Sequence, residues 1–548
     1  MMRPAHYLGA MLPRLLQLSL RLVALLAFIP LVRTASAQDR TGAAASKLES
    51  LLYHIDRMYV DEVDKDELVE AAIIRMLEEL DPHSVYIPKD ELEEVNEPLK
   101  GNFDGIGVQF NLIKDTIYVV DAIAGGPSER LGIRAGDRII TINDTTVAGV
   151  GFRNSDVMAR LRGPKGTKVK VGIQRRMEPG LLEFIITRDK IPIFSVEAAY
   201  MATPKVGYIK VSRFSATTMK EFRNKLSELK AAGMQDLILD LQGNGGGYLR
   251  TAIEMADEFL GDRRLIVYTE GRNSPRDETY ATKEGGFEKG RLVVLVDEGS
   301  ASASEIVSGA VQDWDRGLIV GRRSFGKGLV QRPVMLPDGS AVRLTISRYF
   351  TPSGRCIQKS YEEGPEAYQR EKEQRLASGE LTSADSLQPA DTLKYFTMNK
   401  RVVYGGGGIS PDIFVPIDTV QSSSYFGQLV RRGALNTFAL QYVDLHRSEL
   451  LKAYPDAPKF LAGFKVDQPL VDQLVAQAQK EGVEPDEAGL ARSRELLDTR
   501  LKALIARDLW DTSAYWMVIN AQNPVDRSFQ RAMEALSDNT YQRLGMAR

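Results

Sequence analysis

The chain has 548 residues, and its 71 Lys and Arg side chains nearly balance 73 Asp and Glu side chains. This balance, without a long basic run, argues against a dedicated surface for nucleic acid or for an anionic membrane. Cys356 is the only cysteine, which excludes an intrachain disulfide and a cysteine-based zinc site. Only four histidines occur, namely His6, His54, His83 and His446, and their scarcity restricts the acid–base chemistry open to the chain.

The first residues have the pattern of an export signal. Arginines precede the apolar run LVALLAFIPLV (residues 22–32), and Ala35-Ser36-Ala37 then supplies the small residues of a signal-peptidase site. The apolar run is shorter than the ~20 residues that a membrane span needs. An uncleaved N-terminal anchor is the alternative. We therefore expect a signal peptide at 1–37 and an exported protein that is periplasmic or associated with the cell envelope.

The region 38–98 is predicted to be helical. SKLESLLYHIDRMYV begins with a capping box of Ser46 and Glu49, and DELVEAAIIRMLEEL repeats the helical spacing of apolar residues. The turn DPHS then interrupts the pattern. Because no second histidine is near in sequence, His83 in this turn is expected to be structural rather than a ligand or an acid–base group.

The region 99–190 is predicted to be a small β-rich module. Short β-branched segments such as GIGVQF and TIYVVDAI are separated by Gly, Asp and Asn turns. NSDVMARL (residues 154–161) is expected to form a short helix among these strands.

Strands and helices alternate in the region 191–420, which favours an α/β domain with a largely parallel sheet. DLILDLQ leads through GNGGGY into a helix, and RLVVLV leads through DEGSASASE into another. QRPVMLPDGSAVRLTISRYF is expected to be a hairpin that turns at Pro337-Asp338-Gly339. The stretch 360–398 is polar and poorly periodic, like an insertion or a flexible flap. Residues 421–548 are predicted to form a helical domain, with an apolar stripe made of Leu497, Leu501, Leu504, Ile505 and Leu509.

The segment GRRSFGKGLVQ (residues 321–331) begins with the spacing of a phosphate-binding loop, but two features exclude that reading. Gly328 follows Lys327 where such a loop has Ser or Thr, and a strand rather than a helix is expected next. A solvated surface lysine is the simple alternative. The apolar flanks Phe325 and Leu329 fit a buried lysine better.

The segment GSASASE is expected on a strand-to-helix turn, where a serine hydroxyl lies at the positive end of the helix. Ser302 and Glu305 also form a capping box, and a capping serine needs no catalytic role. Residues 84–445 contain no histidine, so a Ser-His-Asp triad requires His83 or His446 to approach. The remaining option is a serine activated by a neutral lysine, whose pKa burial lowers.

These motifs together resemble the carboxyl-terminal processing peptidases, also called tail-specific proteases, which are Ser-Lys endopeptidases that carry a PDZ domain. The resemblance covers roughly residues 48–416 and rests on LDPHSVYI, GIGVQF, LGIRAGDRIITIND, DLQGNGGG, GSASASEIVSGAVQD, GRRSFGKGLVQ and GGGISPDI. It implies an α/β protease core of the crotonase-like fold at 191–420, a PDZ domain at 99–190, and helical regions at both ends. It implies neither a cofactor nor a metal.

For catalysis, the resemblance implies Ser302 as the nucleophile, Lys327 as the general base and Gln331 as the residue that orients the lysine amine. On pattern alone, Ser300 and Ser304 remain alternatives to Ser302. The backbone amides of Ala303 and Gly246 are implied as the oxyanion hole. One departure is Gln242, where the family often has arginine.

For the β-rich module, the resemblance implies that Gly105, Ile106, Gly107 and Val108 bind a terminal carboxylate while the peptide adds as a strand beside VQFNL. A simple tight β-turn is the alternative for these glycines. The implied partners are proteins or peptides with free C-termini, with membrane proximity and a homodimer as further expectations. A non-catalytic PDZ scaffold or chaperone is the competing function, in which Ser302 only caps a helix and Lys327 lies on the surface.

Overall fold

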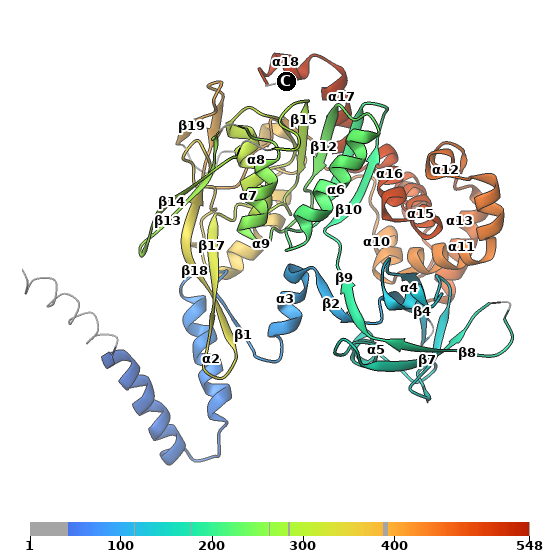
Figure 1. Ribbon diagram of the computed structural model, residues 1–548, viewed down its shortest axis with the longest axis horizontal. Coiled ribbons are helices and arrows are strands. Elements are labelled where there is room, and N and C mark those ends of the chain that lie inside the picture. Colours follow the sequence, from blue (N-terminus) through green and yellow to red (C-terminus); the bar gives the residue numbers. More distant parts are fainter. Residues whose placement is uncertain are drawn as a thin grey trace, which may run out of the picture. The chain divides into compact units, whose positions relative to one another are not determined.

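The computed structural model describes residues 42–113, 115–176, 178–261, 263–282, 285–386 and 393–546 (Figure 1). The signal peptide expected at 1–37 lies outside the described residues. The chain divides into two compact units, residues 1–80 and residues 81–548. Within the described ranges, no helix is both long enough and apolar enough to span a membrane.

The described part of the first unit is helical, as the sequence predicts. Residues 42–58 form one helix and α2 spans Lys65–Glu78. Asp64 caps α2, because its side chain accepts hydrogen bonds from two amides of the first helical turn. The capping box expected at Ser46 is not formed. The helix already extends back to residue 42, so Ser46 lies inside it rather than at its start.

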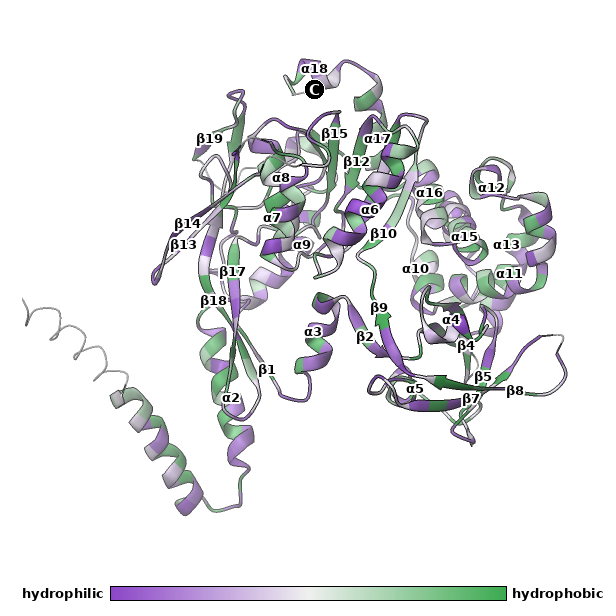
Figure 2. Ribbon diagram, in the orientation of Figure 1, coloured by the Kyte–Doolittle hydropathy of each residue, from purple (hydrophilic) through white to green (hydrophobic). Residues whose placement is uncertain are grey.

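The second unit is built around a six-stranded sheet in the order β10-β11-β12-β15-β16-β21. Its strands span Val196–Met201, Val206–Val211, Asp236–Asp240, Leu292–Val296, Leu318–Gly321 and Ile413–Phe414. All neighbours run parallel except β10, which is antiparallel to β11, so the largely parallel sheet is confirmed. Figure 2 shows β12 and β15 as strongly hydrophobic, which is typical of parallel strands covered on both faces.

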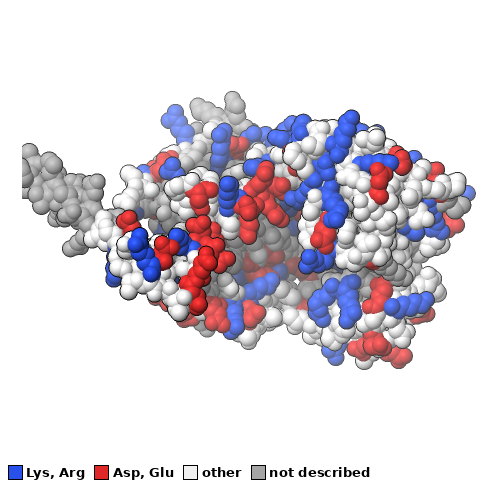
Figure 3. Space-filling model, turned by 90° about the horizontal axis from the view of Figure 1, so that it is seen from below, with Lys and Arg blue, Asp and Glu red and all other residues white. Residues whose placement is uncertain are grey.

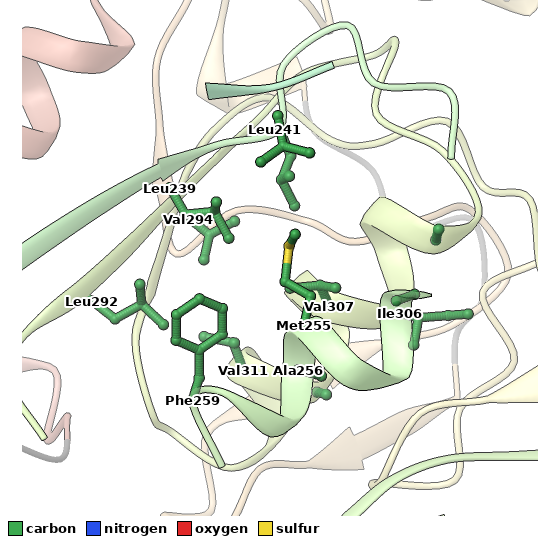
Figure 4. Packing of buried hydrophobic residues seen from close by; sticks show 14 of the residues in the cluster. Leu239, Leu241, Met255, Ala256, Phe259, Leu292, Val294, Ile306, Val307 and Val311 are labelled. Atoms are coloured by element: carbon green, nitrogen blue, oxygen red, sulfur yellow. The ribbon is translucent and has the colours of Figure 1, made fainter. Parts of the chain in front are cut away.

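Helices α6 (Thr218–Ala231), α7 (Leu249–Asp257) and α8 (Ala303–Asp313) share one core with this sheet. Figure 4 shows how the two helices α7 and α8 meet the strands through Leu239, Leu241, Met255, Ala256, Phe259, Leu292, Val294, Ile306, Val307 and Val311. These side chains are at most 3% exposed. On the other face, a second core contains residues of α17 (Ser528–Ser537) and α18 (Thr540–Arg543). The packing therefore fixes α8, whose first turn follows Ser302.

A second sheet is centred on β18 (Ala341–Phe350), which pairs with β17, β1 and β13. The hairpin of β17 (Leu329–Met335) and β18 is confirmed, with Met335 opposite Ala341 across the expected turn. The remaining strands are β1 (Val85–Ile87), β13 (Leu265–Gly271) and β14 (Ser274–Tyr280), with a separate pair of β19 (Lys394–Phe396) and β20 (Val402–Tyr404). Strand β1 lies where only helices were predicted, and α3 (Leu92–Lys100) follows it.

The stretch expected as a flexible flap is ordered in its described part. Helix α9 spans Pro365–Ala377 and η1 spans Ala384–Ser386, whereas residues 387–392 lie outside the described residues. The buried guanidinium of Arg375 donates to the carbonyl oxygens of Arg323 and Ser324 and pairs with Glu380 at 2.9 Å. Buried ion pairs therefore hold this segment, and that is why a search for apolar periodicity misses it.

The PDZ region forms a sheet in the order β3-β4-β5-β7-β8, with β6 beside β5 and a separate ribbon of β2 and β9. The strands span Asn102–Gly105 (β2), Val108–Ile113 (β3), Thr116–Ala122 (β4), Arg138–Ile142 (β5), Thr145–Thr146 (β6), Lys168–Gln174 (β7), Leu182–Thr187 (β8) and Asp189–Pro192 (β9). Its helices are α4 (Pro127–Arg130) and α5 (Asn154–Leu161), and α5 confirms the predicted helix. Strand β3 is an edge of the sheet.

The C-terminal region is helical, as predicted. Its helices are α10 (Ser424–Arg431), α11 (Ala434–Ala453), α12 (Ala457–Gly463), α13 (Gln468–Lys480), α14 (Glu487–Arg492), α15 (Arg494–Leu509) and α16 (Thr512–Gln522). The predicted apolar stripe of α15 lies in their common core, with Leu497 and Leu501 fully buried.

Charged side chains of both signs are interspersed over the face seen in Figure 3. This mixture reflects the near balance of 71 basic and 73 acidic residues.

Replacing Phe259 tests the core that supports α8. Phe259 is 0% exposed, so Phe259→Ala leaves a cavity and is expected to lower the free energy of unfolding by about 3–5 kcal/mol. Urea unfolding followed by tryptophan fluorescence measures the change. Phe194, which is 49% exposed, provides the control: Phe194→Ala should change stability by no more than about 0.5 kcal/mol. Equal losses in the two variants would contradict this account of the core.

Candidate active site

Ser302 stands at the turn between β15 and α8 in a strained backbone conformation. Its φ is 55° and its ψ is −109°, values that a residue with a side chain adopts only when its surroundings impose them. The surroundings are the glycine-rich loop that follows β12. The Ala301 amide and the Ser304 hydroxyl both donate to the carbonyl of Asn244, at 2.9 and 2.8 Å. The two loops thus hold each other at the start of α8.

The buried carboxylate of Glu305 connects the serine turn to the lysine loop. Its Oε2 accepts hydrogen bonds from the amides of Ser302 (2.7 Å) and Lys327 (2.9 Å). Its Oε1 accepts from the Ser324 hydroxyl (2.6 Å) and the Gly326 amide (2.7 Å). Burial raises the pKa of Glu305 to about 7, and the four donors oppose this rise. The contact of Glu305 with Ser302 that SASASE predicts is therefore one of several, because the same carboxylate also binds Ser324, Gly326 and Lys327.

Lys327 lies half-buried, with its amine oriented by Gln331. Lys327 Nζ donates to Gln331 Oε1 at 3.0 Å. Burial lowers the pKa of Lys327, and the positive charge of Arg343 lowers it further, whereas Asp81 and Glu305 oppose the shift. A lowered pKa is what a lysine needs if its neutral amine is to accept a proton.

Gln331 is itself held by the turn DPHS. Its Nε2 donates to the carbonyl oxygen of His83. Asp81 fixes this turn, because its Oδ1 accepts from the amides of His83 (2.8 Å) and Ser84 (2.9 Å). The His83 ring lies 2.7 Å from the hydroxyl of Tyr368 on α9. Burial, followed by the charge of Lys327, lowers the pKa of His83 to about 4, so its imidazole is neutral at pH 7.

Tyr349 fixes the backbones of the two central residues. Its fully buried hydroxyl lies 3.1 Å from the Ser302 carbonyl oxygen and 2.6 Å from the Lys327 carbonyl oxygen. Ser302 and Lys327 thus share two partners, the Tyr349 hydroxyl and the Glu305 carboxylate.

Ser302, Lys327, Gln331 and Gly246 line one cavity of about 430 Å³. Its other lining residues are largely apolar, and they include Ile87 of β1 with Leu92 and Leu99 of α3. Within the described residues, no hydrogen bond joins Ser302 Oγ to Lys327 Nζ. Side chains at a catalytic site can draw together only when substrate binds. The structure therefore brings the predicted nucleophile, base and orienting residue to one cavity.

The two predicted oxyanion donors differ in this arrangement. A Cβ at Gly246 would lie 2.8 Å from Ser302 Cβ and 3.0 Å from the Ala303 nitrogen, so this position must be glycine. The Gly246 amide, however, donates to Asn244 Oδ1 at 2.9 Å and is not free for a substrate. Among the described residues, the amides of Ala303 and Gly247 have no acceptor. The oxyanion role of Ala303 and Gly246 stays a prediction.

The predicted carboxylate loop joins β2 to the edge strand β3. Gly105 ends β2, and Ile106 is buried with its carbonyl accepting from the amide and the hydroxyl of Ser128. Gly107 has a φ of 75°, and a side chain there would press against Ile191. Val108 begins β3. Ser128 thus fixes the loop through the Ile106 carbonyl. One edge of β3 has no partner strand among the described residues.

The described residues hold no group of three or more His, Cys, Asp or Glu side chains placed to bind a metal ion. His446, the remaining histidine of the second unit, is exposed on α11 with its Nδ1 3.1 Å from Glu449.

Several parts of the chain match known protein families. Residues 205–364 match peptidase family S41, residues 94–174 match the PDZ domain and residues 30–91 match the N-terminal domain of the activating protease CtpB. Residues 425–511 match a family of unknown function, DUF8443.

Two bacterial proteins illustrate the similarity. The carboxy-terminal processing protease CtpB of Bacillus subtilis (strain 168) is 35% identical over 330 residues, which cover 60% of this chain and 68% of that protein. The carboxy-terminal-processing protease of Bartonella bacilliformis is 33% identical over 330 residues, covering 59% of this chain and 75% of the relative. A solved photosystem II D1 C-terminal processing protease shares 31% identity, covers 56% of this chain and 88% of its own, and has a TM-score of 0.32.

The chain therefore belongs to the carboxy-terminal processing proteases, serine-type peptidases of family S41 that carry a PDZ domain. It is an enzyme of this class, and its fold is the α/β protease core with a PDZ domain and helical terminal regions that the sequence predicted.

Sequence reasoning missed several residues that shape the site. Asp81 accepts from the Thr345 hydroxyl, Tyr349 bonds to the Ser302 carbonyl, and Tyr368 bonds to His83, and a local pattern does not signal such distant contacts. Gln242, noted as a departure from the family, donates through Nε2 to Asp526 Oδ2 at 3.1 Å.

Replacing Glu305 tests the link between the serine turn and the lysine loop. Glu305→Gln puts an amide NH₂ where two donors now point, so at least two hydrogen bonds to a charged acceptor are lost, each worth about 1.5–3 kcal/mol. We expect kcat on a peptide substrate to fall at least about tenfold and the melting temperature to drop. Ser308→Ala is the control, because the Ser308 hydroxyl donates only to Ser304 O within the same helix. Full activity in Glu305→Gln would show that the link is dispensable.

Proposed function

We propose that this protein is an exported endopeptidase that captures the C-termini of proteins through its PDZ domain and cleaves them by a Ser-Lys mechanism. One observation carries the proposal: the half-buried amine of Lys327, held by Gln331, shares a cavity with Ser302. Neither histidine of the second unit competes for the role of base. His83 is bonded to Tyr368, and His446 is exposed beside Glu449.

In the proposed cycle, the neutral amine of Lys327 removes the proton of Ser302 as Oγ attacks the scissile carbonyl. The negative charge that develops on the carbonyl oxygen is stabilised by the amides of Ala303 and Gly247, which have no acceptor among the described residues, and the Gly246 amide can take part only if its bond to Asn244 opens. One such donor is typically worth about 10²–10³ in rate. The protonated Lys327 then delivers its proton to the leaving amine, and water repeats the sequence on the acyl-enzyme.

The open edge of β3 supports peptide capture by the PDZ domain. A peptide that adds beside β3 extends the sheet by one strand and places its terminal carboxylate at the amides of residues 105–108. The exposed Gln109 and the half-buried Val108 and Phe110 show that the side chains of β3 alternate between its two faces. In such strand addition, main-chain hydrogen bonds give affinity, and pockets for alternate side chains give specificity.

Export and assembly are further parts of the proposal. Export to the periplasm or envelope is proposed from the sequence of residues 1–37 alone. Association into a dimer is supported by apolar side chains that the helix at residues 42–58 exposes, among them Leu48 (46%), Leu51 (55%) and Met58 (75%). Large exposed apolar side chains grouped on one helix are typical of contact surfaces.

Cleavage of one unstructured peptide in two forms tests the proposal. Residues 38–548 should cut the free acid faster than the C-terminal amide, because only the free acid offers a carboxylate to the PDZ loop. Lys327→Ala and Ser302→Ala should each reduce cutting by at least about 10³-fold. Mass spectrometry of the products is the measurement. Equal cutting of both peptides would remove the PDZ loop as a carboxylate reader, and cutting by Lys327→Ala would remove Lys327 as the base.

The pH dependence of cleavage tests Lys327 separately. Because the neutral amine is the active form, kcat/KM should rise with pH and its inflection should lie below the ordinary lysine value of ~10.4. Arg343→Met removes a positive charge that lowers the pKa of Lys327, so the inflection should move to higher pH. Arg348→Met, on the same strand but exposed, should leave it in place. An unchanged inflection in Arg343→Met would contradict the assignment.

A further inference from the structure

Three loops line the catalytic cavity and carry Gly246, Ser302 and Lys327. Each loop has a polar side chain four or five residues before that position. Gln242 lies four residues before Gly246, and Glu298 lies four residues before Ser302. Arg322 lies five residues before Lys327. Hydrogen bonds connect these three side chains, and Asp526, from the linker between α16 and α17, bonds directly to two of them.

Asp526 joins two loops directly and the third through Arg322. Asp526 Oδ2 accepts from Arg322 Nη1 at 2.9 Å and from Gln242 Nε2 at 3.1 Å. Arg322 Nε in turn donates to Glu298 Oε2 at 2.8 Å. The side chains of Arg322 and Glu298 are 4% and 7% exposed. A buried charge that loses one of its partners is costly, so this network holds its members firmly.

The carboxylate of Asp526 is itself held in place. Its Oδ1 accepts from the amide (2.9 Å) and the hydroxyl (2.6 Å) of Ser528, the first residue of α17. The backbone of Asp526 forms an antiparallel bridge with Ile417, which follows β21 of the main sheet. Contacts with Ser528 and Ile417 therefore fix the position of Asp526 independently of its bonds to Gln242 and Arg322.

The backbone of Gln242 is held by Lys210 of β11, and Trp516 of α16 lies against that lysine. Lys210, which is 5% exposed, donates from Nζ to the Gln242 carbonyl at 3.0 Å, and the ring of Trp516 on α16 lies 4.4 Å from that Nζ. Beside these residues, the sheet and the C-terminal helices leave a cavity of about 550 Å³. Polar contacts thus connect the C-terminal region to the loops, in addition to the apolar packing of α17 against the sheet.

We propose that Asp526 is a positioning residue for the protease reaction, and that the C-terminal region thereby completes the frame of the active site. The peptidase family match ends at residue 364 and the match of unknown function ends at residue 511, so neither assigns this role. The inference rests on the proposed Ser-Lys function. Asp526 acts through Gln242 and Arg322, and it touches neither Ser302 nor Lys327.

The test compares two anchors of the C-terminal region at opposite ends of strand β15. Asp526 acts at the end of β15 that leads to Ser302, whereas the Tyr541 hydroxyl bonds to the amide and the carbonyl of Leu292 at the other end. The variants are Asp526→Ala, Asp526→Asn and Tyr541→Phe, all in residues 38–548. The measurements are kcat and KM on the free-acid peptide, the rate at which a fluorophosphonate probe labels Ser302, and the melting temperature.

We expect Asp526→Ala to lower kcat and the labelling rate by about 10- to 100-fold while KM stays within twofold. Asp526→Asn keeps one acceptor oxygen in a side chain of the same shape and should lie between Asp526→Ala and the unchanged protein. It also provides the test if Asp526→Ala does not fold. Tyr541→Phe should lower the melting temperature but keep kcat within twofold.

Full kcat in both Asp526 variants, or an equal loss of kcat in Tyr541→Phe, would overturn the positioning role. Both results would leave the Ser-Lys function intact, because the unchanged protein still cleaves. Unchanged protein that neither cleaves the peptide nor labels Ser302 overturns the proposed function and this inference together.

Discussion

The arrangement of the site depends on one buried carboxylate. Glu305 accepts four hydrogen bonds, two from the segment around Gly326 and Ser324 and one each from the amides of Ser302 and Lys327. A carboxylate can accept at both oxygens, whereas a neutral side chain of the same size cannot satisfy four donors. The first turn of α8 and the loop after β16 are therefore fixed to a common centre, and the strained backbone of Ser302 is one consequence.

The sheet, the DPHS turn and helix α9 each hold one of the segments around Glu305. The parallel sheet and α8 set the direction of the serine turn. The DPHS turn holds Gln331, and Gln331 holds the amine of Lys327. Helix α9 contacts the lysine loop through Arg375. The chemistry needs few groups, but their positions rely on segments from most of the second unit.

Local sequence patterns predicted the helices and strands whose signal lies within one short segment. The alternation of strands and helices, the hairpin β17–β18 and helix α5 all follow from periodicity and turn residues within about 20 positions. Residue type and the scarcity of histidine pointed to a serine activated by a lysine, whereas the choice of Ser302 over Ser300 and Ser304 and the role of Gln331 came from the family resemblance. The sequence predicts an insertion or a flexible flap where helix α9 forms. Buried ion pairs rather than an apolar stripe stabilise this helix, and such pairs leave no periodic pattern in the sequence. The contacts of Asp526 with Gln242 and Arg322 join residues 284 and 204 positions apart, and no local signal exists for such contacts.

The walls of the catalytic cavity come from four separate stretches of the chain, at residues 87–99, 245–249, 302–306 and 327–349. Contacts between residues so far apart form late in folding, because closing long loops costs entropy before the contacts repay it. All the walls of this cavity are therefore present only after the chain from residue 87 to residue 349 has folded together. An unfolded chain carries Ser302 and Lys327 in its sequence but has no site that brings them to one cavity.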